Sequence, residues 1–467
     1  MTVTPGCALI DDRKHIYFTA MDGIRKFSPD GEEIWHYLPH TVPTSVTSQC
    51  PSLMDDSLYG STFQGHMFSV SLDGNERWLE RASHNMEMDT AYVSAHDGLV
   101  LAAFDKRSSK HGRMSGNTKI VALHAANGSK AWEYASEMVL WNFMPMFTED
   151  TFVTMDISGG VYRFGLQNGS LIWHAPPPEE CIESYTDGGC ILGPGNSVVY
   201  TCSNVEGVFG NLAPQQGRGA LRAYQVSDGK LLWERSLPRP CVSWPAVTGD
   251  DRIVVVPVGP LPSPIPFVVL LSFGHVGFSV VVAVISMLMC LLGCYGRRCF
   301  CFTLVTCLFP IIGIPLYHAS NLFLLPRIEL AAQISPGVNL EVLAFEAQTG
   351  APKWHYQDIP PWTFLAARGE EELFIKRVFG KNEFKDRMVC GPASWSAPTF
   401  GGDDTAYMGA MNGFLYSIKD VNGDGRIDSK TEVSTFDLGA ASLHGGAAFA
   451  PGFVAYGSCD GLFAFKI

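Results

Sequence analysis

The feature that most constrains this chain is a short pattern that occurs six times: a turn glycine, three residues and then a tryptophan. The glycine–tryptophan pairs are Gly31–Trp35, Gly74–Trp78, Gly128–Trp132, Gly169–Trp173, Gly229–Trp233 and Gly350–Trp354. Each copy follows an alternating apolar run, which is typical of a β-strand. Because glycine tolerates positive φ, each copy predicts a hairpin whose second strand carries a large aromatic side chain. Six such hairpins indicate a repeated antiparallel sheet.

The repeat extends along the whole chain of 467 residues as eight units of about four strands each. The units begin near Cys7, Pro51, Ala91, Pro145, Cys190, Pro245, Ala397 and Ala447. Such repeats predict an all-β fold, an eight-bladed β-propeller of four-stranded antiparallel blades, because radial repetition protects the sheet edges. The last unit stops before a glycine–tryptophan hairpin, so we expect residues 1–4 to supply its outer strand.

These repeats resemble those of the PQQ-repeat, or quinoprotein-alcohol-dehydrogenase-like, propellers. Residues 340–354, LEVLAFEAQTGAPKW, closely match the family pattern D-G-x-L-Y-A-L-D-x-x-T-G-x-x-x-W. The resemblance spans nearly the whole chain outside one apolar segment and implies the fold. It does not imply an activity, since non-catalytic members such as the outer-membrane assembly propellers carry the same repeat. We expect the six tryptophans to pack between blades.

The apolar segment interrupts the sixth unit. From residue 253 to residue 326 the only formally charged residues are Arg297 and Arg298. A membrane-spanning helix needs about 20 apolar residues. Two segments are long enough, residues 267–295 and 300–325. The sequence therefore predicts three parts: propeller residues 1–259, an inserted transmembrane helical hairpin at 260–335, and propeller residues 336–467. A packed apolar domain and non-coding sequence translated in frame are the alternatives.

Both ends of the insertion join one blade, so the number of membrane spans is even, and two spans fit. Basic residues beside a span favour the cytoplasmic side, so Arg297 and Arg298 place the propeller outside the cell or in a lumen. The sequons at Asn127 and Asn168 suit that side, although both also fit ordinary hairpin turns. Residues 1–10 show no cleavable signal. An incomplete N-terminus, targeting by the hairpin, and a cytosolic propeller all remain open.

One motif predicts a metal site. Residues 420–428, DVNGDGRID, place oxygen donors at positions 1, 3, 5 and 9 of a loop with glycine at position 6, as in EF-hand and dockerin-like calcium loops. Asp420, Asn422, Asp424 and Asp428 would offer side-chain oxygens and Arg426 its carbonyl. Position 12 is Thr431, while Glu432 stands one place late. We expect a structural Ca²⁺ in a hairpin turn, a metal-free turn being the alternative.

The cysteines and the loops before the innermost strands leave other possibilities open. Eight of the 13 cysteines lie outside the insertion, which fits disulfides and buried thiols equally. Five of these, Cys7, Cys50, Cys190, Cys241 and Cys390, precede innermost strands, where they would form a ring of thiols or simply pack. The candidate ligand-binding residues at the mouth of the ring are Glu87, Asp89, Trp244, Trp395 and His444.

The net charge of −13 argues against nucleic acid as a partner. A PQQ-dependent dehydrogenase needs inward metal ligands, a general base and, in alcohol-oxidising members, a vicinal disulfide, but the chain contains no Cys-Cys pair. The sequence thus favours a non-enzymatic, membrane-tethered binding or scaffold module. It predicts a protein partner on the loop-lined face and membrane contact through residues 267–325. The alternatives are a PQQ-dependent quinoprotein oxidoreductase and a polysaccharide-binding propeller.

Overall fold

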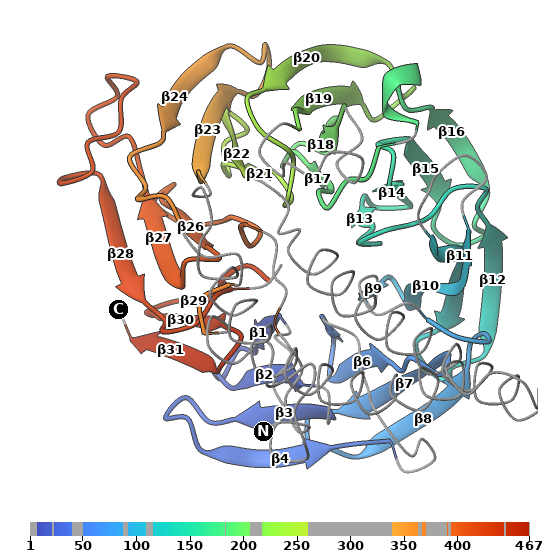
Figure 1. Cartoon of the computed structure of the whole chain (residues 1–467). Helices are drawn as coiled ribbons and strands as arrows, with labels where there is room; N and C mark the ends of the chain where they lie inside the picture. Colours follow the sequence, from blue (N-terminus) through green and yellow to red (C-terminus); the bar gives the residue numbers. More distant parts are fainter. Residues whose placement is uncertain are drawn as a thin grey trace, which may run out of the picture.

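Eight antiparallel sheets are arranged around a central axis in the computed structural model of this chain (Figure 1). The structure describes residues 7–20, 23–39, 50–86, 92–108, 115–182, 184–205, 217–259, 339–362, 367–369, 390, 394–442 and 445–466. In each blade the first strand lies nearest the axis and the last lies at the rim (Figure 1). The all-β, eight-bladed propeller predicted from the repeat is confirmed.

The strands follow the predicted units in order. Blades 1 to 4 comprise β1 (Ala8–Ile10), β2 (Ile16–Ala20), β3 (Gly23–Phe27) and β4 (Glu33–Tyr37); β5 (Ser52–Met54), β6 (Ser57–Ser61), β7 (His66–Ser71) and β8 (Glu76–Arg81); β9 (Val93–His96), β10 (Leu99–Ser108), β11 (Ser115–His124) and β12 (Lys130–Ala135); and β13 (Met146–Phe147), β14 (Thr151–Met155), β15 (Val161–Gly165) and β16 (Leu171–Ala175).

Blades 5 to 8 continue the same order. They comprise β17 (Cys190–Leu192), β18 (Val198–Asn204), β19 (Gly219–Gln225) and β20 (Leu231–Leu237); β21 (Ala246–Val247), β22 (Ile253–Val258), β23 (Glu341–Glu346) and β24 (Pro352–Tyr356); β25 (Thr399–Phe400), β26 (Ala406–Gly409), β27 (Phe414–Ile418) and β28 (Val433–Asp437); and β29 (Ala448–Ala450), β30 (Phe453–Gly457) and β31 (Leu462–Lys466). A short 3-10 helix, η2 (Glu179–Cys181), precedes blade 5.

The repeated tryptophans form the seams between blades. The turn glycine before each of them has positive φ, between 66° and 88°. Trp132 of blade 3 lies over Gly169 in the corresponding turn of blade 4 and donates its indole N–H to the Leu166 carbonyl at 2.8 Å. Equivalent bonds run from Trp35, Trp78, Trp173 and Trp233 to the next blade. The glycine is needed both for the turn and for the close approach of this ring, and the predicted packing role is confirmed.

Blade 8 closes the ring against blade 1. Ala8, Ile16 and Phe18 share one apolar core with Phe453 and Ala455, and Lys466 forms an ion pair with Asp30 at 2.7 Å. Within the described residues this blade has three strands rather than the predicted four. The outer strand predicted from residues 1–4 lies outside the described residues. The closed ring, rather than an open stack of sheets, is therefore fixed by apolar contact between the first and last blades.

The predicted helical hairpin at 260–335, with its proposed spans at 267–325, also lies outside the described residues. Within the part of the chain that the structure does describe, no helix has the length and apolar character required to cross a membrane. What the structure defines is the blade that the insertion interrupts, because β22 and β23 pair along their whole length on either side of it.

Candidate functional site

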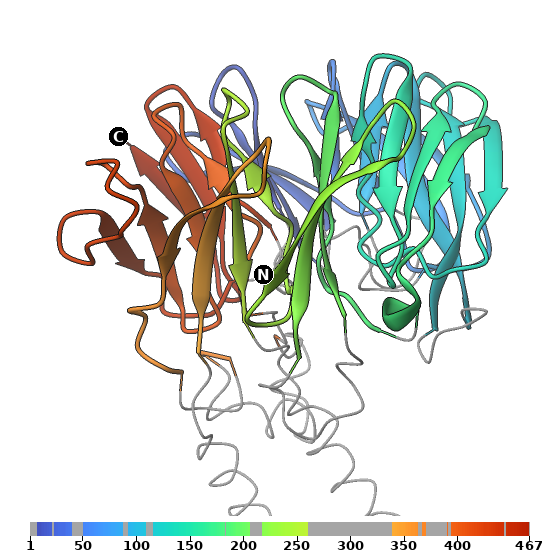
Figure 2. The same cartoon turned by 90° about the horizontal axis from the view of Figure 1, so that it is seen from above.

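The two faces of the ring carry different connections. Since strands alternate in direction, the turns between second and third strands and the links between blades lie on one face, which we call the connector face. The turns between first and second and between third and fourth strands lie on the other, the turn face. In Figure 2 the ends of β22 and β23 that flank the insertion point to the lower side of the ring. The insertion therefore leaves from the connector face.

The base of the insertion is held firmly. Val258 and Glu341 are paired across β22 and β23, so the chain leaves and returns at adjacent strands. The Val258 carbonyl accepts the indole N–H of Trp395 at 3.1 Å, and the Gly259 amide donates to the Pro240 carbonyl at 3.2 Å. The buried carboxylate of Glu341 contacts Arg239 and, at 2.8 Å, His355.

Glu341 is one of the few buried carboxylates in the structure. Its two oxygens contact Arg239 Nε and His355 Nε2 separately. Arg239 belongs to the link that enters blade 6, whereas His355 lies on β24. The first residue of β23, the strand that follows the insertion, is thus tied both to its own blade and to the link before it, which holds the return point of the insertion in place.

Three disulfides also belong to neighbouring blades. They join Cys7 to Cys50, Cys202 to Cys241, and Cys390 to Cys459. Each links consecutive blades: 1 with 2, 5 with the entry to 6, and the entry to 7 with 8. The two remaining described cysteines, Cys181 and Cys190, are buried thiols, and burial raises the pKa of Cys190 to about 12. Of the two uses of cysteine left open by the sequence, disulfides account for six residues and buried thiols for two.

Side chains that precede the innermost strands of different blades pack together near the axis of the ring. Cys50, Tyr92 and Trp244 form a buried cluster in which the rings of Tyr92 and Trp244 meet edge to face, 5.7 Å between centroids. A side chain at Gly189 would collide with the indole of Trp244. Trp244 and Trp395, predicted as mouth residues, are 4% and 0% exposed. Both are packing residues in this structure; Glu87, Asp89 and His444 lie outside the described residues.

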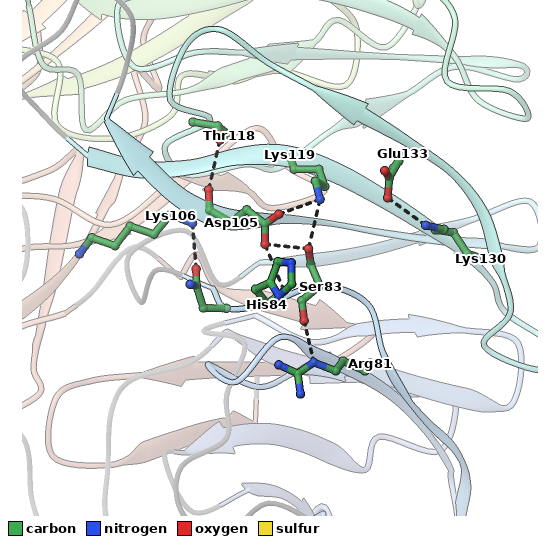
Figure 3. A network of polar contacts seen from close by, with 10 residues as sticks. Arg81, Ser83, His84, Asp105, Lys106, Thr118, Lys119, Lys130 and Glu133 are labelled. Carbon is green, nitrogen blue, oxygen red and sulfur yellow. Dashed lines mark hydrogen bonds and ion pairs between the residues drawn. The ribbon is translucent and has the colours of Figure 1, made fainter.

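A buried polar network fixes the segment that leaves blade 2 (Figure 3). Asp105, with φ of 61°, forms an ion pair with Lys119 at 2.7 Å and accepts the Ser83 hydroxyl and the His84 amide at 2.7 and 3.1 Å. Burial opposes ionisation of Asp105, but these three donors outweigh it and lower its pKa to about 2. The sequence analysis missed this network, since its partners lie far apart in the chain.

A second buried carboxylate closes the β14–β15 turn. Asp156 accepts the amides of Ser158 and Gly160 at 2.9 Å each and the Tyr162 hydroxyl at 2.9 Å. Burial raises its pKa to about 6 despite these donors. In the comparable turn of blade 7, Ala410 stands at the position of Asp156. Asn412, two residues further on, accepts the Phe414 amide and donates to the Tyr416 hydroxyl at 2.8 Å. Polar side chains at two different positions therefore close this turn in the two blades.

The predicted calcium loop connects β27 to β28, so a strand flanks it on each side, as the sequence indicated. Asp420 accepts the amides of Gly423 and Gly425, Asn422 that of Asp424, Asp424 that of Arg426, and Asp428 that of Lys430. These bonds leave lone pairs on every carboxylate. Among the described residues, however, no three acidic, histidine or cysteine side chains converge closely enough to hold a metal ion. Calcium binding stays a prediction.

Glu432 has a role that the sequence did not indicate. It is 7% exposed, and its carboxylate accepts the amides of Val421 and Asn422 at 2.9 and 3.2 Å and that of Asp428 at 2.9 Å. Its position one place late therefore lets it close the loop through backbone donors. Ile427 packs on the core cluster that contains Trp354, so the loop replaces the usual glycine turn at the seam between blades 6 and 7.

Exposed apolar side chains gather on the outer strands of two adjacent blades. Leu171 and Ile172 on β16 are 43% and 48% exposed, and Leu231 and Leu232 on β20 are 45% and 44% exposed. We call these four residues the rim pairs. Neither strand has a further strand beside it within the described residues. The rim pairs follow the turns at Gly169 and Gly229 directly, so they border the turn face.

The chain is similar to known propellers in sequence and in structure. A family model described as outer membrane protein assembly factor BamB matches residues 20–184. BamB from Moraxella catarrhalis is similar with a TM-score of 0.54 and 11% identity, over 100% of this chain and 99% of that one. The computationally designed Ika8 protein gives 0.54 and 10%, over 99% and 97%. No curated protein sequence matches the chain.

The quinohemoprotein alcohol dehydrogenase from Comamonas testosteroni is also similar, with a TM-score of 0.54 and 9% identity, over 97% of this chain and 70% of that one. At these identities the likeness to the three solved structures concerns the fold alone. A designed protein, an assembly factor and an enzyme share it, so the fold does not decide between binding and catalysis.

Proposed function

We propose that this chain, a PQQ-repeat β-propeller, is a membrane-tethered, non-enzymatic module that binds or scaffolds another protein. The observation that carries the tether is the geometry at Val258 and Glu341. These residues are direct partners on adjacent strands, so an apolar insertion between them returns to its starting point. Two spans satisfy this requirement, and the charge-poor sequence of 260–335 suits them.

Protein binding is supported by two features. The rim pairs place four exposed apolar side chains on neighbouring blades, the kind of surface at which partners dock. The matching family model is described as an assembly factor, a role that consists of contact with other proteins. If the connector face is held against the membrane, the turn face and the adjoining rim remain accessible. We therefore expect the partner on the loop-lined turn face, in contact with the rim pair Leu231 and Leu232.

Alkaline carbonate extraction of the full chain tests the tether. We expect the full chain to stay with the membrane, and a variant in which residues 260–335 are replaced by a short Gly-Ser turn to be released. The variant should fold, because Val258 and Glu341 can be joined by a hairpin turn. Release of the full chain by carbonate would overturn the tether.

Capture of partners from detergent extracts tests the binding surface. We expect the L231S/L232S variant to lose the captured protein, because both side chains are exposed and their replacement leaves the core unchanged. Ile34→Ser is the matched control, since Ile34 is 49% exposed on the outer strand of blade 1, away from the rim pairs. If both variants captured the partner protein equally well, the proposed binding surface would be wrong.

The quinoprotein alternative is tested separately. The protein is mixed with PQQ and Ca²⁺, and cofactor absorbance and dye reduction with alcohols are measured. We expect neither stoichiometric uptake nor turnover, because Tyr92 and Trp244 pack against each other near the axis, where the cofactor would enter. Uptake with turnover would replace the binding module with an oxidoreductase.

A further inference from the structure

We propose that Asn127 and Asn168 are N-glycosylated and that both glycans project from the turn face, opposite the insertion. The location of the propeller outside the cytosol rests on the proposed function. Asn127-Gly-Ser and Asn168-Gly-Ser are the two N-x-S/T sequences in the chain. They occupy the same position in consecutive blades, the turns between β11 and β12 and between β15 and β16.

The turn itself explains the asparagines but not the serines. Asn127 Oδ1 accepts the Ser129 amide at 3.0 Å, and Asn168 Oδ1 accepts the Ser170 amide at 3.0 Å. Asp228 and Thr349 make the same bond in blades 5 and 6, to Lys230 and Ala351. The turn thus requires an acceptor at its first position and no hydroxyl at its third. In the six turns the hydroxyl occurs only where the first residue is asparagine.

The geometry leaves each asparagine available. Both are exposed. The underside of the turn is used for packing instead: a Cβ at Gly128 would lie 2.7 Å from Trp78 of the preceding blade. Ser129 donates its hydroxyl to Asn127 Oδ1 at 2.8 Å, an arrangement that polarises the amide whose nitrogen is to be modified. Within the described residues, neither Nδ2 makes a hydrogen bond.

The modification is a group transfer with a defined balance. The amide Nδ2 attacks C1 of the first sugar of a lipid-linked oligosaccharide diphosphate. A C–N bond forms, the C–O bond to the lipid diphosphate breaks, the lipid diphosphate leaves as the anion, and one Nδ2 proton passes to a general base of the transferase. Three disulfides between blades support the same compartment independently, because disulfides persist where N-glycosylation occurs, outside the reducing cytosol.

Translation of the full chain with endoplasmic-reticulum microsomes tests the proposal. We expect two glycan additions, seen as a mobility shift that an endoglycosidase removes. Ser129→Ala and Ser170→Ala should each abolish one addition and the double variant both. Ser129→Thr and Ser170→Thr preserve the sequons and should restore the shift, which separates loss of the acceptor from misfolding.

Carbonate extraction of the same samples keeps the two ideas distinguishable. Glycosylated chain that resists extraction supports both the modification and the tether. Glycosylated chain that is released supports the modification and overturns the tether. Unmodified chain that resists extraction supports the tether and overturns the modification. Unmodified, released chain overturns both.

Discussion

Buried carboxylates show how single residues in this propeller are controlled by their surroundings. Asp105 and Asp156 are both nearly inaccessible, yet the pKa of the first is lowered to about 2 and that of the second raised to about 6. The difference is a cation: Lys119 lies 2.7 Å from Asp105, whereas Asp156 has only neutral donors. Charge compensation thus decides whether burial costs stability.

Replacing Asp156 with asparagine should stabilise the protein at neutral pH. The raised pKa means that the folded state holds the proton more tightly, so stability falls as pH rises from about 4 to about 6. The variant should gain about 3 kcal/mol at pH 7 and lose this pH dependence, as measured by urea unfolding across pH. Asn412→Asp is a comparison variant, because it places a buried acid in the comparable turn of blade 7, two residues after the position equivalent to Asp156, and should destabilise. Lower stability of Asp156→Asn at pH 7 would contradict the argument.

Replacing Asp105 with asparagine should have the opposite effect. The lowered pKa means that its stabilisation is present above about pH 4 and is lost as pH falls toward 2. Removing the charge leaves Lys119, whose side chain is 20% exposed, without its partner, at a cost of about 3 kcal/mol. Glu133→Gln breaks the exposed pair with Lys130 and should cost under about 1 kcal/mol. Equal unfolding midpoints for the two variants would count against the network.

At the scale of elements, the repeated unit is the hairpin between the third and fourth strands of a blade. Blade 7 has a modified form of this hairpin. Five hairpins place a glycine under the tryptophan of the previous blade. In blade 7 the longer loop closes around Glu432 instead, and Ile427 contributes to the seam. A loop of this kind has many oxygen acceptors near one another, which is why metal and metal-free states of it are both feasible.

Calcium should stabilise this hairpin if the predicted ligands act together. At 100 times the dissociation constant, Ca²⁺ would raise stability by about 2.7 kcal/mol, measured as a thermal shift against EDTA and Mg²⁺. The D420N/D424N variant removes two ligand charges and should lose the response, while Asp403→Asn, in an exposed turn of the same blade, should keep it. An unchanged melting temperature with Ca²⁺ would leave the loop as a metal-free turn.

At the scale of the whole molecule, the ring depends on contacts between first and last blades and on covalent links between neighbours. The paired cysteines of the three disulfides are 43, 39 and 69 residues apart in the sequence. Chain-entropy arguments assign each loop of this size about 4 kcal/mol. Reduction should therefore lower the unfolding temperature strongly. Peptide mapping without reductant should recover the three linked pairs, whereas recovery of Cys181 or Cys190 in a linked pair would contradict the pairing.

The C181S/C190S variant is the matched control for reduction. Both cysteines are buried thiols, so the variant should respond to reductant as the original chain does. A response that disappears in this variant would mean that these thiols, not the three pairs between blades, carry the redox sensitivity.

Local chemistry in the sequence was sufficient for the repeat. Gly169 and Trp173, for example, specify a turn, a strand and an aromatic seam within five residues. That unit recurs six times, and the strand pattern around it recurs eight times, once for each blade. The loop at 420–428 could likewise be recognised between two strands. These features are predictable because each depends on neighbours in the chain, where backbone propensity and side-chain alternation act directly.

The tertiary structure alone decided which distant groups meet. The same set of cysteines can be paired in many ways, and only the folded ring brings Cys390 beside Cys459. Trp244 and Trp395 occupy loops that the sequence assigned to a mouth, but converging blades bury them. Asp105 gains Lys119 and Ser83 only when β10, β11 and the link after β8 come together. Packing density and desolvation set these outcomes, and neither is a property of the local sequence.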